Sequence, residues 1–293
     1  MTRGTIGDRP KAILCLVITA ILWSLGGILI KLVNSNALAI AGTRSAFAAL
    51  IIFLYLRKPR FTWSAAQIGA ALAYTATVIL FVAANKLTTA ANAILLQYTA
   101  PVYVAIFGAW LLKEKAKLYD WGAIILTIGG MILFFMDSLD TSGFMGNACA
   151  LLSGVSFALF AVFMRMQKDG SPLETVLLGN LLTALIGLPF LFGDLPDAKG
   201  WAGLVLLGVF QLGLPYIFYV KAVKHLTALE IILIPVIEPV LNPVLVFLTI
   251  EEVPGTMAFA GGAVVLAVIT AWCCIPVIRS RRMKSGTDGS MKP

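Results

Sequence analysis

A carboxylate and an amide stand in the middle of an apolar run between residues 226 and 250. Glu238 and Asn242 are four residues apart, so on a helix they share one face. An ionised carboxylate is costly in apolar surroundings, and Glu238 should therefore be protonated, paired or in contact with water. Such a side chain can carry a proton or bind a cation. The alternatives are a neutral glutamic acid that hydrogen-bonds a neighbouring helix, and an Asn242 that holds a free backbone carbonyl.

Composition identifies a lipid bilayer as the surroundings of this run. Hydrophobic residues make up 60% of the 293 residues and charged residues only 12%, whereas soluble domains carry about 25% charged residues. The apolar runs have the length of about 20 residues that a helix needs to cross a hydrocarbon core. We therefore predict an all-α integral membrane protein with ten transmembrane helices and no soluble domain. The predicted spans are 11–33, 37–56, 64–85, 89–112, 119–136, 144–166, 173–192, 200–223, 227–249 and 255–278.

Prolines interrupt several of these spans near the expected midplane. A proline inside a helix removes one hydrogen bond and pushes away the carbonyl four residues earlier. Lipid offers such carbonyls no partner, and irregular backbone is tolerated only against protein or a water-filled cavity. The ninth span, which carries three prolines, should therefore line a cavity. The predicted helix-breaking residues are Pro101, Pro215, Pro235, Pro239 and Pro243.

The basic residues are unevenly distributed over the connections between spans. If the N-terminus is cytoplasmic, 18 of the 22 Lys and Arg residues fall on the cytoplasmic side. By the positive-inside rule, both termini are then cytoplasmic, in a chain that crosses the cell inner membrane many times. The net charge of +8 is a topological signal under this interpretation and does not indicate a nucleic-acid partner.

The chain contains an internal repeat. Residues 86–114 align without a gap on residues 224–252 at a constant offset of 138, with Pro101 opposite Pro239. With small shifts, Arg44 falls opposite Asn180. Ten spans thus form two halves of five, which must insert in opposite orientations because five is odd. Inverted repeats are typical of secondary transporters, whose site lies near the midplane where the halves meet. The predicted division is a cytoplasmic segment (1–10), a first repeat (11–136), a second repeat (144–278) and a basic cytoplasmic tail (279–293).

The chain resembles the drug/metabolite transporter superfamily, EamA type, over about residues 11–278. In each half a Pro-Val helix is followed by an acidic residue, and Trp23, the Arg44 of GTRSAF and the glycine pairs 129–130 and 261–262 are similar to the family pattern. Phe157 departs from it, because the family often has tryptophan there. The resemblance implies a small-solute exporter or permease with a central cavity lined mainly by helices 1, 3, 4, 6, 8 and 9. Family members handle amino acids, nucleotide-like metabolites, vitamins and cationic drugs, so the solute stays open.

Helical spacing within these spans selects the residues that could face the cavity. Aromatic faces beside a few amides suit amphipathic or cationic organic solutes, although aromatic side chains also simply pack between helices. Arg44 lies near enough to the outer end of its span to snorkel to the interface, or it pairs with an acidic group or a solute carboxylate. Thr227 and Glu230 have the spacing of a capping box that opens the ninth span. The candidates are Trp23, Arg44, Tyr74, Thr77, Phe81, Gln97, Gln211, Tyr216, Tyr219, Glu238 and Asn242.

The favoured function is secondary transport: the protein would export a small organic solute, such as an amino acid or related metabolite, by alternating access. Coupling to protons through Glu238 is a further hypothesis. The alternative within transport is a multidrug or quaternary-cation exporter. An intramembrane or lipid-handling enzyme is a third class, but the sequence has no His cluster with metal spacing, no Ser/His/Asp set and no nucleotide-binding glycine motif. No metal and no cofactor are expected. The sequence leaves the oligomeric state open.

The topology gives a direct prediction. A reporter protein fused after Pro293 should give a cytoplasmic signal, because the last connection and the tail belong to the basic side. A periplasmic signal from that fusion would contradict the assigned orientation. A second fusion, in the predicted outer connection near Lys199, is the matched control and should report the opposite side.

Overall fold

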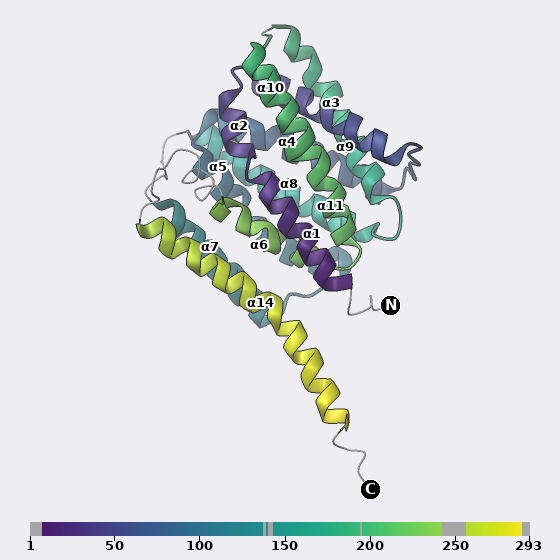
Figure 1. Ribbon diagram of the computed structural model, residues 1–293, viewed down its shortest axis with the longest axis vertical. Coiled ribbons are helices and arrows are strands. Elements are labelled where there is room, and N and C mark those ends of the chain that lie inside the picture. The colour runs from purple at the N-terminus through teal and green to yellow at the C-terminus, as the bar shows by residue number, and fades with distance from the viewer. Residues whose placement is uncertain (1–7, 137–138, 140–142, 194, 242–255, 289–293) are drawn as a thin grey trace.

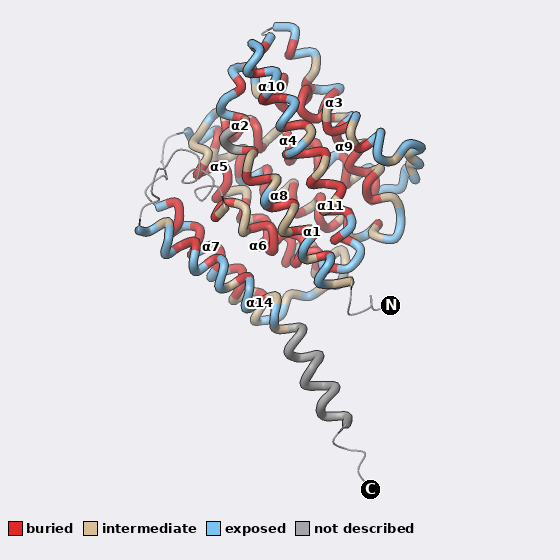
Figure 2. Tube along the Cα trace, viewed as in Figure 1, coloured by how far each residue is buried: buried red, intermediate tan, exposed pale blue. Residues whose placement is uncertain are grey.

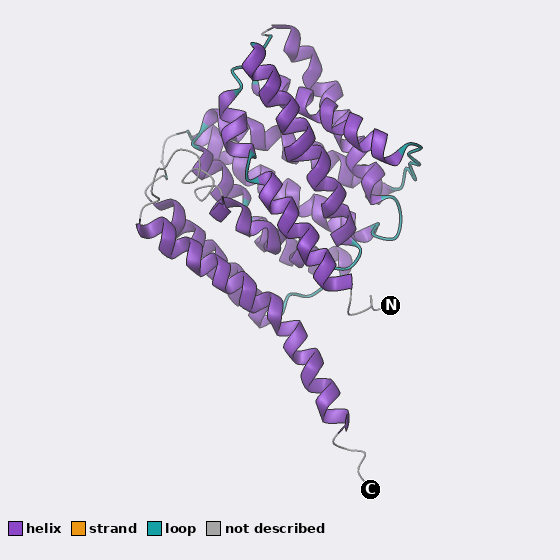
Figure 3. Ribbon diagram, in the orientation of Figure 1, coloured by secondary structure: helices purple, strands orange, loops and turns teal. Residues whose placement is uncertain are grey.

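The computed structural model describes residues 8–136, 139, 143–193, 195–241 and 256–288. Within these ranges every regular element is a helix and no strand occurs (Figure 3). Eight helical segments are long and apolar enough to cross a membrane. They are α3 (Ala37–Leu56), α4 (Ala65–Leu87), α5 to η1 (Ala90–Leu112), α7 (Leu118–Phe135), α8 (Phe144–Met166), α9 with η3 (Pro172–Gly193), α10 to α11 (Ala198–Val223), and the part Thr256–Ile275 of α14 (Thr256–Asp288).

The two predicted spans missing from this set have different explanations. The first, 11–33, is divided into α1 (Asp8–Trp23) and α2 (Gly26–Leu32), with a turn at Ser24 and Leu25 between them. The ninth, 227–249, begins as α12 (Ala228–Leu233) and the 3₁₀ segment η5 (Ile234–Ile237), and its end lies outside the described residues. Asn242 and Pro243 belong to that part.

Three further spans combine helix types, one of them α9 with η3, and proline accounts for the change of helix type in the span 198–223. The segment 198–223 consists of α10 (Ala198–Leu206), the π-helix η4 (Leu207–Gly213) and α11 (Leu214–Val223), with Pro215 in the first turn of α11. Because Pro215 has no N–H, the carbonyl of Gln211 loses its usual donor and the helix widens there. Pro101 likewise stands in the first turn of α6 (Ala100–Phe107), which follows α5 (Ala90–Gln97) and precedes the π-helix η1 (Gly108–Leu112).

Threonine side chains cap the N-terminal ends of the two aligned segments. The Thr89 hydroxyl accepts a hydrogen bond from the Asn92 N–H at the start of α5. At the start of α12, the Thr227 hydroxyl accepts from the Glu230 N–H while the Glu230 carboxylate accepts from the Thr227 N–H. The capping box predicted from the sequence is therefore confirmed, and both segments begin by the same local mechanism.

The closest helix packing joins elements from before residue 136 with elements from after residue 143. The main pairs are α4 with α8, α3 with α9, α1 with α11, and α7 with α14. In Figure 1, α7 and α14 lie side by side along one edge of the bundle. Burial follows this arrangement (Figure 2): the span 198–223 is 67% buried, whereas the span 256–275 is 28% buried and turns most of its apolar surface outward. The centre of the bundle therefore lies among α1, α4, α8 and α11.

Glycines allow α3 and α9 to approach backbone to backbone. A Cβ added at Gly187 would lie 2.2 Å from the carbonyl oxygen of Leu38 and 2.6 Å from the Cα of Gly42. No side chain fits there without separating the two helices. Small residues at such crossings are the usual way in which membrane helices gain van der Waals contact, because lipid leaves no hydrophobic driving force between them.

We predict that Gly187→Val destabilises the protein, because overpacking of a fitted interface costs about 1–3 kcal/mol or more. Gly129→Val on α7 is the matched control, since a Cβ there meets no atom within 4 Å. Thermal unfolding of both variants in detergent micelles is the measurement. Equal midpoints for the two variants would show that the α3 and α9 contact is not tight.

Candidate functional site

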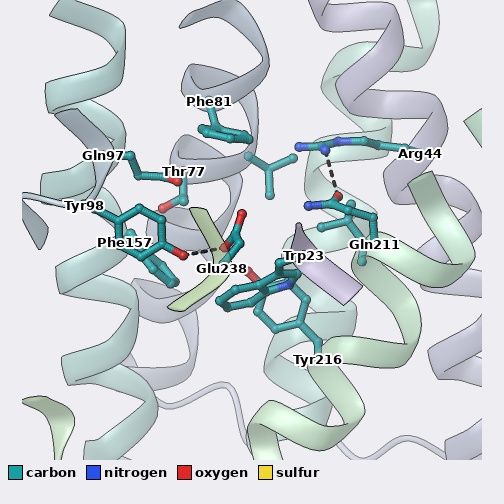
Figure 4. Close-up of a pocket in the computed structure, with 12 residues that line it drawn as sticks. Trp23, Arg44, Thr77, Phe81, Gln97, Tyr98, Phe157, Gln211, Tyr216 and Glu238 are labelled. Atoms are coloured by element: carbon teal, nitrogen blue, oxygen red, sulfur yellow. Dashed lines mark hydrogen bonds between the residues drawn. The ribbon is translucent and has the colours of Figure 1, made fainter. Parts of the chain in front are cut away.

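A central cavity lies among α1, α3, α4, α8, η4, α11 and the segments around Tyr98 and Glu238 (Figure 4). Its polar lining consists of Arg44, Thr77, Gln97, Tyr98, Gln211 and Glu238. Its apolar and aromatic lining consists of Trp23, Val78, Phe81, Phe157, Leu212 and Tyr216. The free volume is about 50 Å³, room for a few water molecules. An organic solute would therefore require some of the lining side chains to move.

Glu238 and Tyr98 form one side of the cavity. The Tyr98 hydroxyl hydrogen-bonds the Glu238 carboxylate and also lies 3.2 Å from the carbonyl oxygen of Pro235. Pro235 is the residue four positions before Pro239, so its carbonyl lacks the i+4 donor of an ordinary helix and accepts instead from the Glu238 N–H in the 3₁₀ turn. The hydroxyl of a residue from the first half of the sequence thus contacts both the carboxylate and a carbonyl that already has one backbone donor. Tyr98 has one hydroxyl proton for two acceptors.

Arg44 and Gln211 form the other side. Arg44 Nη1 donates a hydrogen bond of 3.0 Å to the Gln211 side-chain oxygen, and the arginine is only 1% exposed. Its Nε is buried without a partner in the described part of the chain. Gly26 makes room for Gln211, because a Cβ at that position would lie 2.9 Å from the amide nitrogen. The turn after α1 and the π-helix η4 therefore cooperate to place this amide beside the guanidinium.

The two opposite charges in the cavity do not pair with each other. Among the residues that the structure describes, salt bridges join Arg9 with Glu230 and Arg165 with Glu114, and neither involves Arg44. Figure 4 shows Tyr98 and Glu238 on one side of the cavity and Arg44 and Gln211 on the other. The site therefore presents a guanidinium and a carboxyl group at separate positions, with the rings of Trp23 and Tyr216 below them and that of Phe81 above in the view of Figure 4.

A cluster of six aromatic rings adjoins the cavity. Its members are Trp23, Tyr74, Phe157, Phe160, Tyr216 and Tyr219, with ring centroids 5.0 to 6.4 Å apart in each contacting pair. All six are buried. Along α8 the chain runs from Phe157 through Phe160 towards its C-terminal end, and along α11 from Tyr216 through Tyr219. The ring cluster therefore fills the space between the cavity and the end of the bundle at which α8 and α11 finish.

Charged side chains gather at that end, around a second cavity of about 250 Å³ that Arg9, Glu114 and Glu230 help to line. Arg165, at the end of α8, donates to Glu114 at 3.1 Å and to the carbonyl oxygen of Val223 at 3.1 Å. Glu114 also accepts from the N–H of Ala228 at the start of α12. Arg9 on α1 pairs with Glu230 at 2.6 Å. The contacts of Glu114 with Arg165 and Ala228, and of Arg9 with Glu230, join the first half of the sequence to the second, whereas Arg165 and Val223 both belong to the second half.

Most of the candidates named from the sequence meet in the cavity. Eight of them line it: Trp23, Arg44, Thr77, Phe81, Gln97, Gln211, Tyr216 and Glu238. Tyr74 and Tyr219 lie in the ring cluster instead, where the Tyr74 hydroxyl donates to the Asn180 side-chain oxygen at 3.1 Å. Asn242 lies outside the described residues.

Sequence reasoning missed four lining residues, the aliphatic Val78 and Leu212 and the aromatic Tyr98 and Phe157. Tyr98 stands next to Gln97, and the turn between α5 and α6 brings both side chains to the cavity, which regular helical spacing does not indicate. The repeat alignment could have predicted Phe157 as a lining residue, because it aligns with the candidate Trp23. Its ring contacts Trp23 at a centroid distance of 5.8 Å.

Comparison with known proteins identifies the class of this fold and cavity. The model of the EamA-like transporter family matches residues 10–136 and again residues 144–272, so the chain belongs to that family. It is 24% identical over 261 residues to an uncharacterised transporter of Archaeoglobus fulgidus, covering 88% of this chain and 94% of that protein. It is also 24% identical over 286 residues to the pseudopaline exporter CntI of Pseudomonas aeruginosa, covering 93% and 97%.

A vertebrate relative and a solved structure complete the comparison. Solute carrier family 35 member G1 of Mus musculus is 27% identical over 292 residues, covering 88% of this chain and 77% of that protein. One crystal structure superimposes with a TM-score of 0.77 at 18% identity, covering 94% of this chain and 99% of that chain, and thus shares the fold. The protein is therefore a membrane transporter of the drug/metabolite superfamily and not an enzyme.

The Tyr98 contacts give a stability prediction. Tyr98→Phe removes the hydroxyl that hydrogen-bonds Glu238, and loss of a buried hydrogen bond that leaves its partner group unserved costs about 1–3 kcal/mol. Tyr103→Phe, one turn into α6 and outside the cavity lining, is the control and should be close to neutral. The thermal midpoint in detergent reads out both variants. A Tyr98→Phe protein as stable as wild type would mean that water replaces the hydroxyl.

Proposed function

We propose that the protein is a ten-helix secondary transporter built as two inverted repeats, 11–136 and 144–278. Two family-model matches of similar length support this division. The packing supports it too: exchanging the two repeats converts the contact of α4 with α8 into that of α11 with α1, and maps the pair α3 with α9 and the pair α7 with α14 onto themselves. Contacts related in this way are expected of a pseudo-two-fold axis in the membrane plane.

The proposed orientation places both termini in the cytoplasm and the protein in the cell inner membrane. The support is the asymmetry of Lys and Arg, with 18 of 22 on one side. The end of the bundle that carries Arg9, Glu114 and Arg165 is then the cytoplasmic side. In this orientation the conformation is closed towards the cytoplasm, by the ring cluster and by the ion pairs beyond it.

The proposed activity is export of a small organic solute, such as an amino acid or related metabolite, through the central cavity. The observation that carries it is the presence of Glu238 and Arg44 in one cavity between the two halves of the chain. Polar groups of this kind at the meeting point of two repeats are costly in lipid and are typical of a transport pathway. The relative named as an exporter of pseudopaline supports the outward direction for an organic solute.

Alternating access requires contacts that both halves contribute and that can separate. Arg9 with Glu230, and Glu114 with Arg165, each join one half to the other. In the ring cluster, Trp23 comes from the first half and contacts Phe157 of the second at 5.8 Å. Rocking of the halves would break these contacts and open the cavity to the cytoplasm.

Proton coupling through Glu238 has a structural basis in Tyr98. With Glu238 ionised, the Tyr98 hydroxyl donates to the carboxylate. With Glu238 protonated, the carboxyl group can donate to the Tyr98 oxygen and leave the hydroxyl proton for the Pro235 carbonyl at 3.2 Å. Both protonation states of Glu238 are thus compatible with satisfied hydrogen bonds, as a group that takes up and releases a proton requires.

A quaternary-cation exporter is the second candidate. Trp23, Tyr98, Phe157 and Tyr216 surround the Glu238 side of the cavity with aromatic rings. Rings beside a carboxylate are a common way to bind an organic ammonium group, through cation–π contact and charge. Under this reading Glu238 is the counter-charge of the solute and needs no proton.

The test is solute flux and charge movement in proteoliposomes, over a panel of amino acids, small metabolites and quaternary cations at two pH values. Wild type should move amino acids or related metabolites with a current that depends on the pH gradient. Glu238→Gln should abolish that dependence, because it cannot exchange a proton. Glu174→Gln, partly exposed in the first turn of α9, is the matched control and should behave as wild type.

The two candidates give different results in this assay. A response to organic cations alone, lost in Glu238→Gln without any proton signal, would favour the cation exporter. Transport by Glu238→Gln that equals wild type at both pH values would remove Glu238 from the coupling mechanism. No flux of any solute in the panel would contradict transport as the function of this cavity.

A further inference from the structure

Arg44 is a buried cation that the protein neutralises incompletely. Its guanidinium makes one hydrogen bond, of 3.0 Å, to the neutral side chain of Gln211, and its buried Nε has no partner in the described ranges. Burying a charge without a paired opposite charge is strongly unfavourable. An incompletely neutralised charge that lines a cavity in a membrane protein therefore indicates a site for a partner from outside the fold.

The repeat shows that this position does not need a charge for packing. The residue aligned with Arg44 in the second half is Asn180, on α9. Its amide nitrogen donates to the carbonyl oxygen of Val176 at 2.9 Å, and its oxygen accepts from the Tyr74 hydroxyl at 3.1 Å. An amide thus fills the equivalent site with satisfied hydrogen bonds, whereas the arginine leaves its buried Nε without a partner in the described ranges.

The opposite charge in the same cavity lacks a cationic partner as well. Glu238 contacts the Tyr98 hydroxyl, and the salt bridges in the described part of the chain join other residues. Like Arg44, Glu238 has an aligned residue in the other half that carries no charge, Ala100. The first half therefore contributes the basic group, Arg44, and the second half the acidic group, Glu238, on opposite sides of the cavity.

We propose that the solute is a small zwitterion, with its carboxylate bound by Arg44 and its ammonium group bound by Glu238. The proposal rests on the proposed transport function and specifies its substrate class. A carboxylate can accept two parallel hydrogen bonds from a guanidinium, which would give the free Nε an acceptor. The ammonium group would lie against Glu238 and the faces of Trp23 and Tyr216. A single solute then neutralises both charges.

A solute with one charge would satisfy only half of this site. An organic cation would bind beside Glu238 but would leave Arg44 without an anion and add a second positive charge to the cavity. An anion would bind beside Arg44 but would leave Glu238 without a cation and add a second negative charge to the cavity. The combination of charges therefore disfavours the quaternary-cation candidate, although the rings beside Glu238 suit it.

The test uses solutes from which one charge at a time is removed. L-alanine, L-leucine and L-phenylalanine are first compared in proteoliposomes, and the one with the highest uptake is taken as the parent. Competition is then measured with its methyl ester, which lacks the carboxylate, and its N-acetyl derivative, which lacks the ammonium group. For wild type, we expect each derivative to compete at least tenfold less well than the parent.

Two variants locate the two recognition sites. In Arg44→Gln the apparent affinity for the parent solute should fall at least tenfold, while the methyl ester should compete as well as it does with wild type. In Glu238→Gln the apparent affinity for the parent solute should fall at least tenfold, while the N-acetyl derivative should compete as well as it does with wild type. Arg57→Gln removes the same charge from the exposed end of α3 and serves as the control that keeps wild-type selectivity. The wild-type series needs no variant to fold, so it decides the proposal by itself.

The outcomes separate this proposal from the proposed transport function. If the methyl ester or the N-acetyl derivative competes as well as the parent, the zwitterion proposal is wrong. If cations or neutral solutes move while no amino acid does, the zwitterion proposal fails and transport by the cavity stands. If the parent is selected over both derivatives without any pH dependence, the zwitterion proposal stands and proton coupling fails. Absence of flux for every solute would overturn both.

Discussion

The hydrocarbon core of a membrane offers no hydrogen-bond partner, and this constraint governs where the chain can depart from a regular helix. A free carbonyl or an unpaired charge is tolerated only against protein or in a water-containing cavity. Four departures in the described residues gather around one place, whereas η1 and η3 contribute no residue to the cavity lining. The turn after Trp23, the break at Tyr98, the π-helix that carries Gln211 and the 3₁₀ turn before Glu238 all border the central cavity. Irregular backbone and functional side chains share a location because the same surroundings permit both.

Under the proposed mechanism, contacts between the two halves of the sequence determine whether the cavity is open or closed. Near the cavity the halves meet through aromatic rings, and beyond the rings they meet through the ion pairs Arg9 with Glu230 and Glu114 with Arg165. Several of these polar groups also belong to the local structure, because Glu230 caps α12 and Glu114 accepts from the Ala228 N–H. Separation of the halves would therefore disturb helix ends as well as ion pairs. This links the geometry of the ninth span to the state of the cavity.

The two halves are alike in backbone but different in chemistry. Thr89 and Thr227 cap equivalent helices, and Pro101 and Pro239 occupy equivalent positions. The charged residues differ between the halves, since Arg44 aligns with Asn180 and Glu238 aligns with Ala100 in the repeat. A symmetric backbone provides two similar bodies that can move against each other. The asymmetric side chains give the cavity one basic side and one acidic side, which is the basis of the proposed zwitterionic solute.

The sequence by itself determined the membrane environment, the helical class, the repeat and the family, because apolar length, charge asymmetry and internal alignment are properties of the linear chain. It also indicated Glu238 and Arg44, since charged residues within apolar spans need a partner or a polar cavity wherever they lie. Only the tertiary structure decided that Tyr98 serves Glu238, that Gln211 serves Arg44, and that Tyr74 and Tyr219 pack in the ring cluster. These outcomes depend on which helix faces are brought together, and on the local π and 3₁₀ turns that rotate side chains away from regular helical spacing.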